Sequence, residues 1–289
     1  MNGEQTTSIR AGKVMRLKNY TLPVGERTCI MGILNVTPDS FSDGGQYLDP
    51  VRAVEKARQM VEEGADIIDI GGESSQPGSE RITVEEELHR VMPAIKALRE
   101  SAGVPLSIDT CKSEVAREAL AEGVSMVNDI TALRGDPEMA RTIAGFDAGV
   151  VLMHMKGRPG TMQEAPRYDD VIGEIFSYLS GSITLAEEAG IDPDKIIIDP
   201  GIGFGKTVEH NLVILRRLAR FRDLGKPVLV GTSRKSFIGR LTGRGVDKRE
   251  FGTAASCAAA VMGGADIIRV HNVAEMRDVT RVVDAIQGV

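Results

Sequence analysis

The sequence lacks several features that would assign it to a special class of protein. Its three cysteines, Cys29, Cys111 and Cys257, have the spacing of neither a disulfide framework nor a set of metal ligands. No apolar run approaches the length of a membrane span. The net charge of −6 argues against a general nucleic-acid surface, although it leaves room for a local basic pocket. These absences favour a protein of a reducing cytoplasm.

The chain also lacks a Pro/Ser-rich linker or a shift in composition along its 289 residues. This length can bury a large core without disulfides. We therefore expect one domain, residues 28–289, preceded by an N-terminal extension, residues 1–27. Within the extension, Val14–Leu22 is expected to form a strand or hairpin that closes the bottom of a barrel. Met1–Gly12 is polar, has no apolar core of the kind found in secretory signals, and is expected to be poorly ordered.

From Thr28 onward, short apolar runs alternate with amphipathic stretches. The first run, Cys29–Leu34, has no polar alternation, which is typical of a strand buried on both faces in a parallel sheet. The later runs are Ile67–Ile70, Leu106–Ile108, Met126–Val127, Gly149–Met153, Ile196–Ile198, Val228–Val230 and Ile267–Arg269. Eight strand–helix units in strict alternation predict an α/β fold, a single (β/α)8 TIM barrel.

Local signals mark the ends of the expected helices. Thr83 with Glu86 has the spacing of a capping box, and Ser113 is a candidate N-cap. The segment Gly64–Ile68 recurs unchanged as Gly264–Ile268. Both segments read as a helix stop, a short turn and a buried strand, which is the joint expected on the bottom face of a barrel.

Polar residues stand where nearly every predicted strand ends. The carboxyl ends of all strands in a barrel meet at one mouth. Taken singly, each residue could be a helix cap or a satisfied turn residue. Taken together, they would be costly to bury unless they contact a polar ligand or one another. The set is Asn35, Glu73, Asp109, Asn128, His154, Asp199, Lys235, Arg269 and His271.

Part of this set suits a flat nitrogen heterocycle. Asp109, Asn128 and Asp199 offer hydrogen-bond donors and acceptors for the edge of such a ring. Met153 and Phe204 could supply apolar and stacking contacts to its faces.

Another part suits an anion such as phosphate. Asn35, Arg269 and His271 could bind it together with the loop at residues 232–234, which contains Arg234. A diphosphate would usually bring Mg²⁺ with it, and the amide oxygen of Asn35 could meet that ion.

The glycine-rich segment Gly201–Thr207 has the look of a phosphate-binding P-loop. The motif requires a glycine where Pro200 stands, so it fails by one residue. We expect its glycines to let the backbone approach a ligand closely, and Thr207 to be the N-cap of the following helix.

In order along the chain, the strand-end motifs resemble those of the bacterial dihydropteroate synthase family, a family of pterin-binding barrels. The resemblance covers nearly all of Ile30–Val289. The motifs are Asn35–Gly45, Asp69–Ser75, Ser107–Thr110, Val127–Asp129, Met153–His154, Asp199–Phe204, Gly231–Ser236 and Arg269–His271.

The resemblance implies a transferase of folate biosynthesis that joins 6-hydroxymethyl-7,8-dihydropterin diphosphate to p-aminobenzoate, giving 7,8-dihydropteroate and diphosphate. It implies a cytoplasmic homodimer that uses Mg²⁺, with Asn35 as the metal ligand. It implies catalytic roles for Asp109, Lys235, Arg269 and Asn35. It implies pterin binding by Asp109, Asn128, Met153, Asp199, Phe204, Lys235 and Arg269. It implies diphosphate binding by Asn35, Ser75, Arg269 and His271. It implies a p-aminobenzoate pocket, and hence competition by sulfonamides, at Thr37, Pro38, Phe41, Ser75, Pro77, Lys235 and Ser236.

One residue departs from the family pattern. This departure and the fold leave other functions to be weighed against the synthase. Many members have Arg where this chain has Gln76, which supplies no charge. A pterin-dependent methyltransferase acting with a corrinoid protein would share the pterin contacts but needs no diphosphate site. A non-catalytic pterin-binding relative would be expected to lose Lys235 or the first loop, and neither is lost. A Schiff-base aldolase is the least supported, because Lys235 follows Arg234 in a predicted loop.

Overall fold

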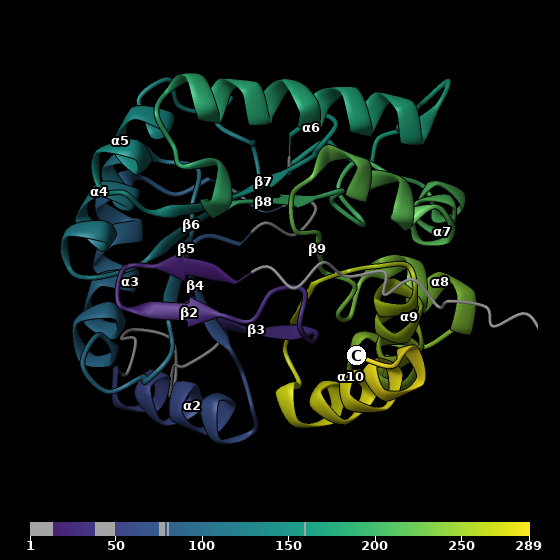
Figure 1. Cartoon of the computed structure of the whole chain (residues 1–289), viewed down its shortest axis with the longest axis horizontal. Coiled ribbons are helices and arrows are strands. Elements are labelled where there is room, and N and C mark those ends of the chain that lie inside the picture. The colour runs from purple at the N-terminus through teal and green to yellow at the C-terminus, as the bar shows by residue number, and fades with distance from the viewer. Residues whose placement is uncertain (1–13, 38–49, 75–78, 80, 159) are drawn as a thin grey trace, which may run out of the picture.

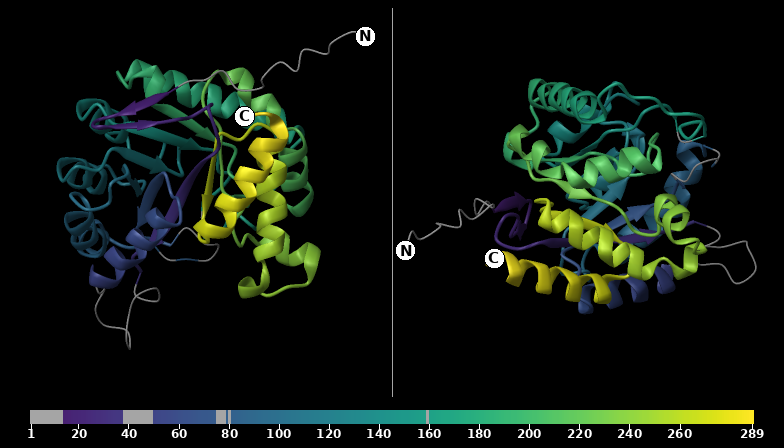
Figure 2. Two further views of the ribbon diagram at one scale, coloured as in Figure 1. Left: turned by 60° about the horizontal axis from the view of Figure 1, so that its bottom comes forward. Right: turned by 90° about the vertical axis from the view of Figure 1, so that its right-hand side faces the viewer.

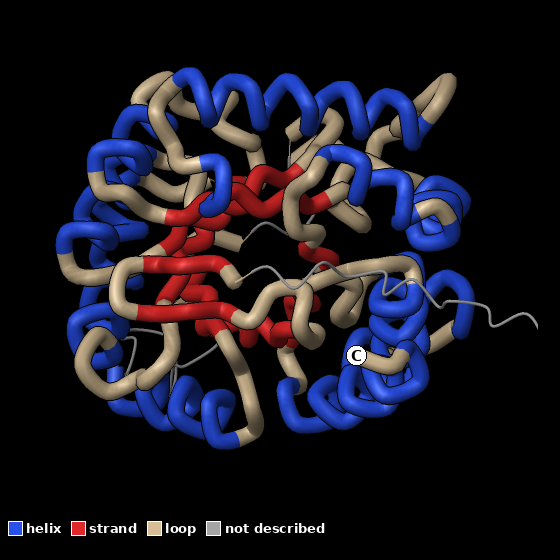
Figure 3. The backbone as a smooth tube through the Cα atoms, viewed as in Figure 1, coloured by secondary structure: helices blue, strands red, loops and turns tan. Residues whose placement is uncertain are grey.

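Eight parallel strands form a nearly closed barrel that is surrounded by helices (Figures 1 and 3). The structure is a computed structural model that describes residues 14–37, 50–74, 79, 81–158 and 160–289. Residues 1–13, which include the segment expected to be poorly ordered, lie outside this part. The TIM-barrel prediction is confirmed. The barrel strands are β3 (Cys29–Asn35), β4 (Ile67–Gly71), β5 (Leu106–Asp109), β6 (Met126–Asp129), β7 (Gly149–Met153), β8 (Ile196–Asp199), β9 (Leu229–Val230) and β10 (Ile267–Val270).

The strands pair in the order β8-β7-β6-β5-β4-β3-β10-β9, with every neighbouring pair parallel. Closure between β8 and β9 is short, because β9 contains only two residues. It consists of a bridge between Ile198 and Val228, with the Ile198 N–H donating to the Pro227 carbonyl at 2.9 Å.

The helices lie between successive strands and form the outer layer seen in Figure 3. They are α2 (Pro50–Glu62), α3 (Val84–Leu98), α4 (Ser113–Ala121), α5 (Met139–Gly145), α6 (Val171–Glu188), α7 (Val208–Arg216), α8 (Ser236–Thr242), α9 (Glu250–Met262) and α10 (Val273–Gln287). Short 3₁₀ turns are η1 (Pro193–Lys195), η2 (Leu218–Leu224) and η3 (Val246–Lys248). Within the described ranges, no helix has both the length and the apolar character needed to span a lipid bilayer.

One helix prediction needs correction. The short helix α8 was not predicted, and it makes strict strand–helix alternation an oversimplification. Lys235 lies in the loop after β9, as predicted, and is the extended residue just before α8. Between β8 and β9, α7 is followed by η2, because Arg217 leaves the helical region with φ −112° and ψ 21°.

The predicted caps had mixed outcomes. Thr83 accepts a hydrogen bond from the Glu86 N–H at 3.2 Å, which confirms it as the N-cap of α3. The N-cap prediction for Ser113 is wrong. Lys112 occupies the N-cap position of α4, and the Ser113 N–H donates at 2.8 Å to the Asp136 carboxylate. A distant carboxylate therefore satisfies the orphan donor that a local cap would otherwise bind.

The barrel interior is apolar at the end where the strands begin. A short antiparallel hairpin, β1 (Met15–Leu17) and β2 (Tyr20–Leu22), packs into this end. Figure 1 shows the purple hairpin lying across the strands, and the right-hand view of Figure 2 places it at the same end as the C-terminus. The interior cluster contains Met15, Leu17, Leu22, Val24, Cys29, Met31, Ile67, Met126, Val151, Ile197, Leu229 and Ile267.

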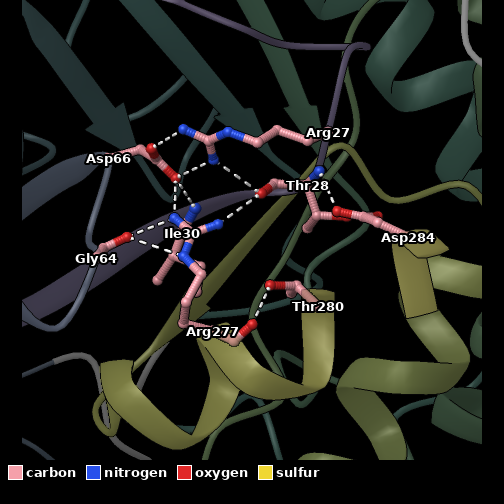
Figure 4. Close-up of polar contacts among 8 residues, drawn as sticks. All are labelled: Arg27, Thr28, Ile30, Gly64, Asp66, Arg277, Thr280 and Asp284. Carbon is pink, nitrogen blue, oxygen red and sulfur yellow. Dashed lines mark hydrogen bonds and ion pairs between the residues drawn. The ribbon is translucent and has the colours of Figure 1, made fainter. Parts of the chain in front are cut away.

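A buried polar cluster stabilises the joint at the start of β3 and β4 (Figure 4). Asp66 accepts from both guanidinium nitrogens of Arg27, at 2.6 and 3.0 Å, from the Ile30 N–H at 2.8 Å and from Arg277 at 2.5 Å. Arg277 also donates to the carbonyls of Gly64 and Thr28. One carboxylate thus links the lead-in to β3, the turn before β4 and helix α10.

The repeated Gly-Ala-Asp segment forms the same joint at the start of β10. The Asp266 carboxylate accepts from the Val228 N–H at 2.9 Å, as Asp66 does from Ile30. Arg222 donates to the Gly264 carbonyl at 2.9 Å but reaches Asp266 only at 3.4 Å. The repeat predicted a shared bottom-face joint, and this prediction is confirmed.

The two joints provide a matched pair of stability predictions. Asp66→Ala leaves the buried Arg277 guanidinium and the Ile30 N–H without this acceptor, so we expect a loss of about 3 kcal/mol or more in the free energy of unfolding. Asp266→Ala removes a longer ion pair, so we expect a loss of about 1–2 kcal/mol. Chemical denaturation of both variants measures the difference. An equal or greater loss for Asp266→Ala would contradict it.

Candidate active site

Strand pleating brings polar side chains to the inside of the barrel mouth. Side chains two positions apart on a strand share a face. The apolar interior cluster includes Ile67, Met126, Ile197 and Ile267. The residues two positions further along the same strands are Asp69, Asn128, Asp199 and Arg269. The interior therefore changes from apolar to charged within one step toward the mouth.

Arg269 bridges two carboxylates inside the barrel. Its Nε donates to Asp69 Oδ2 at 2.7 Å, and a terminal nitrogen donates to Asp109 Oδ2 at 2.6 Å. The Asn128 side-chain amide also donates to Asp69 Oδ2, at 3.0 Å. The Asp69 side chain is fully buried, and that of Arg269 is 18% exposed. These contacts hold three predicted site residues in one network, with the charges of each sign close together.

The Asp109 carboxyl group binds its proton more tightly than an ordinary aspartate does. Burial raises its pKa to about 7; Arg269 opposes this shift, and the negative charge of Asp69 adds to it. A positive charge that develops beside Asp109 would favour its ionised form and be stabilised by it. The group is therefore suited to interact with a cationic centre.

Asp199 and Lys235 border an apolar wall. Asp199 Oδ1 accepts from the Gly201 N–H at 2.7 Å, and burial raises the Asp199 pKa to about 6. The Lys235 ammonium lies 4.0 Å from the centroid of the Phe204 ring, and burial lowers its pKa to about 8. Phe204 packs with Met153. A carboxylate and an ammonium at the edges of an apolar wall suit a planar heterocycle with polar edges.

The ring of His271 can donate a hydrogen bond to a ligand through Nε2. Burial lowers its pKa to about 3, so the ring is neutral. Ser233 Oγ accepts from the His271 backbone N–H and lies 2.8 Å from the ring Nδ1. A Ser233 hydroxyl that donates to Nδ1 would leave the ring proton on Nε2. Arg234 of the same loop donates to Asn272 at 2.7 Å. This arrangement offers donors to an anion.

Asn35 lies beside Asp109 at the mouth. A Cβ at Gly71 would be 3.6 Å from both Asn35 Oδ1 and Asp109 Cβ. Gly71 therefore leaves a small space between an amide oxygen and the Asp109 side chain, and this pair of groups is suited to a hard cation.

Several predicted pocket residues cannot be placed. Thr37 is half-buried after β3, and Ser236 is exposed at the start of α8. The remaining members lie outside the described residues: Pro38, Phe41, Ser75 and Pro77. The same is true of Gln76, the departure from the family pattern.

Two strand-end residues do not face the mouth. His154 follows the inward-facing Met153 and packs edge-on against the Tyr178 ring, with the ring centroids 4.8 Å apart. Glu73 forms an ion pair with Lys112, which also binds the buried Glu87. These two side chains therefore contact the surrounding structure and not the space inside the mouth.

Sequence reasoning assigned no role to Asp69 or Lys206. Asp69 was quoted within a motif, and its position two residues after the interior Ile67 was the available signal. Lys206 lies within the glycine-rich segment, and its side chain is buried. The N-cap prediction for Thr207 is confirmed, because its hydroxyl accepts from the His210 N–H. The glycines were expected to approach a ligand, but Gly201 lies against the backbone of His154.

A family model described as pterin binding enzyme matches residues 31–271, which include every strand end of the barrel. The chain is 49% identical over 263 residues to a dihydropteroate synthase of Synechocystis, covering 91% of this chain and 91% of the relative. The chain belongs to the dihydropteroate synthase family. This family match covers the same strand ends that form the Arg269 network.

Solved dihydropteroate synthase structures have the same fold. The Yersinia pestis enzyme, solved with a sulfonamide drug complex, is 40% identical with a TM-score of 0.90 and covers 96% of this chain and 99% of its own. The Xanthomonas albilineans enzyme, solved with 4-aminobenzoic acid, is 45% identical with a TM-score of 0.90 and covers 96% of this chain and 100% of its own. These relatives favour the synthase over the corrinoid-dependent methyltransferase and the aldolase.

Proposed function

We propose that this site joins 6-hydroxymethyl-7,8-dihydropterin diphosphate to p-aminobenzoate, forming 7,8-dihydropteroate and releasing diphosphate. The observation that carries the proposal is the buried network of Arg269 with Asp69, Asp109 and Asn128. A barrel mouth with this much buried charge is suited to a polar, ring-shaped substrate. The family relationship supplies the reaction.

The pterin ring fits the wall at Phe204 and Met153. The Asp199 carboxylate keeps one oxygen on the Gly201 N–H, and its other oxygen accepts from the amino edge of the ring. Asn128 and Lys235 complete the polar edge, and Arg269 lies beneath the ring. The substrate methylene then lies toward Asp109.

The reaction breaks the bond between the pterin methylene carbon and the diphosphate oxygen. The bonding electron pair leaves with diphosphate, and positive charge develops on the pterin methylene. Asp109 stabilises this charge, while Arg269 and the Nε2–H of His271 stabilise the departing anion. The aryl amine of p-aminobenzoate attacks the methylene and releases one proton. No covalent bond to the enzyme is needed.

The p-aminobenzoate pocket involves the loops after β3 and β4 with Ser236. The Xanthomonas relative solved with 4-aminobenzoic acid supports such a pocket, and the Yersinia relative supports competition by sulfonamides. Gln76 replaces a charged residue that many members have. Loss of one charge-assisted contact would weaken substrate binding by about 1.5–3 kcal/mol without removing the catalytic groups.

Magnesium is part of this proposal. Among the described residues, no three His, Cys, Asp or Glu side chains gather as a metal site. Mg²⁺ commonly takes only one or two protein ligands and completes its shell with substrate phosphates and water. The Asn35 amide oxygen beside Asp109 fits that role. When bound, the ion would neutralise charge on the leaving diphosphate.

We also propose a cytoplasmic homodimer. The segment from α8 to α10 exposes large apolar side chains, and Phe251 is 91% exposed. A protein contact that covers these side chains would remove their apolar surface from water. The group comprises Leu241, Val246, Phe251, Met262, Val282 and Ile286.

Diphosphate release tests the synthase reaction. With dihydropterin diphosphate and Mg²⁺, formation of dihydropteroate should require p-aminobenzoate. Asp109→Asn should lower kcat by about 10²–10³-fold, because it removes the charge that stabilises the cation. Asp247→Asn, on the exposed η3 turn, is the control. Pterin binding by calorimetry without turnover in the wild-type chain would instead identify a binding-only relative.

Chelation of Mg²⁺ should abolish diphosphate release. Asn35→Ala should raise the Mg²⁺ concentration for half-maximal activity by about tenfold, because it removes the protein ligand. The measurement is a Mg²⁺ titration at saturating substrates. An unchanged titration midpoint would remove Asn35 from the metal site.

Light scattering tests the dimer. The wild-type chain should show twice the monomer mass of 31.1 kDa. Phe251→Asp should shift the equilibrium toward monomer, because it places a charge on the apolar contact. A wild-type monomer at micromolar concentration, or a Phe251→Asp dimer of unchanged affinity, would exclude this interface.

A further inference from the structure

Lys206 is a buried lysine to which the proposed reaction assigns no task. It follows β8 by a glycine-rich loop, and it is only 2% exposed. Its ammonium lies 2.9 Å from the Phe204 carbonyl, 3.3 Å from the His154 carbonyl and 3.0 Å from the His154 ring Nδ1. Three acceptors match the three hydrogens of an ammonium. In the described part of the chain, no carboxylate forms an ion pair with it.

The lysine joins two loops that lie against each other. Gly201 has φ +69° and Gly205 has φ +63°, and a Cβ at these positions would be 1.9 Å from the His154 carbonyl oxygen and 2.2 Å from the Lys156 carbonyl oxygen. The loop after β8 is thus pressed, backbone to backbone, on the loop after β7. Only glycine permits both the positive φ and this approach. The glycine-rich segment is therefore a packing motif that delivers Lys206 to its acceptors.

The residues held by this ammonium adjoin the pterin wall. Phe204, whose carbonyl accepts from Lys206, forms the wall with Met153. His154, which accepts twice, follows Met153 directly. One side chain thus fixes the backbone beside both wall residues. Its effect on the wall is transmitted through these loops, since Lys206 itself is sealed from the mouth.

The charge of Lys206 acts on Asp199. Burial raises the Asp199 pKa, and the hydrogen bond from the Gly201 N–H opposes that shift together with the positive charges of Lys235, Lys206 and Arg269. Burial lowers the Lys206 pKa to about 7, Asp199 opposes this shift, and Lys235 and Lys156 add to it. The titratable groups packed around Lys206 are His154 and Lys156 after β7, Asp199 on β8, Lys235 before α8, Tyr168 and Tyr178 beside His154, and His210 on α7.

We propose that Lys206 is a positioning residue for the pterin substrate, which holds the Phe204–Met153 wall in place and adds its charge to that of Lys235 in favouring ionised Asp199. This inference rests on the proposed function. The neutral His154 ring supports it, because burial lowers the His154 pKa to about 2, so that Nδ1 remains free to accept from the ammonium.

Lys206→Met tests the proposal, because it keeps the unbranched side chain, one atom shorter, and removes the charge and the donors. We expect the KM for dihydropterin diphosphate to rise by about tenfold or more, while the KM for p-aminobenzoate changes less than about twofold. The matched control is Lys156→Met on the same pair of loops. Its ammonium lies 4.1 Å from the Tyr168 ring centroid and binds Glu174, away from the wall.

The pH dependence of pterin affinity separates positioning from simple support of the fold. Pterin binding requires ionised Asp199, so affinity falls as pH drops through the Asp199 pKa. Removing Lys206 raises that pKa, so the acid limb of the affinity profile should move to higher pH in Lys206→Met. A purely structural role would lower affinity equally at all pH values. An unmoved limb with an unchanged pterin KM would overturn the proposal.

Two further measurements cover the remaining outcomes. If Lys206→Met does not fold, Lys206→Gln keeps hydrogen-bond donors without the charge, and it should retain the wall but still shift the acid limb. In the wild-type chain, the ¹⁵N signal of the Lys206 amine should change when the pterin binds, and an unchanged signal would contradict the proposal. Absence of wild-type turnover with intact pterin binding would reject the synthase while leaving the Lys206 affinity test in force.

Discussion

The guanidinium of Arg269, held between Asp69 and Asp109, is the contact on which the site depends. Removing Arg269 would leave two buried carboxylates without the positive charge that both of them share. The network also fixes Asn128, and its Arg269 opposes the effect of burial, which raises the Asp109 pKa to about 7. It can lie inside the barrel because the layer below is apolar and closely packed. The lower layer supplies stability, and the upper layer supplies the chemistry.

Most of the barrel could be predicted from the chain alone. Apolar runs without alternation mark strands covered on both sides, and the repeated Gly-Ala-Asp segments mark the bottom joints. The carboxyl ends of the predicted strands then locate the mouth, because all strands of such a barrel end at the same face. Asn128 and Asp199 were identified in this way, because a residue at the carboxyl end of a barrel strand has few other places to point.

Other features depended on partners distant in the sequence. Ser113 has the local signature of a cap, but the carboxylate of Asp136 binds its backbone. Lys206 looks like part of a phosphate loop, but its acceptors come from the preceding strand's loop. Asp69 stands among apolar neighbours, and its partners are Arg269 from β10 and Asn128 from β6. No local pattern contains these pairings, because each one exists only after the barrel closes.

The N-terminal hairpin has a consequence for the order of events. Met15, Leu17 and Leu22 fill the end of the barrel where the strands begin, so the site opens at the opposite end, the barrel mouth. Under the proposed function, both substrates would reach the site through this one opening. The pterin, bound against the Phe204 wall, would then have to enter before p-aminobenzoate. An inhibitor in the p-aminobenzoate position would hold the bound pterin in the site, and its own affinity would depend on that pterin.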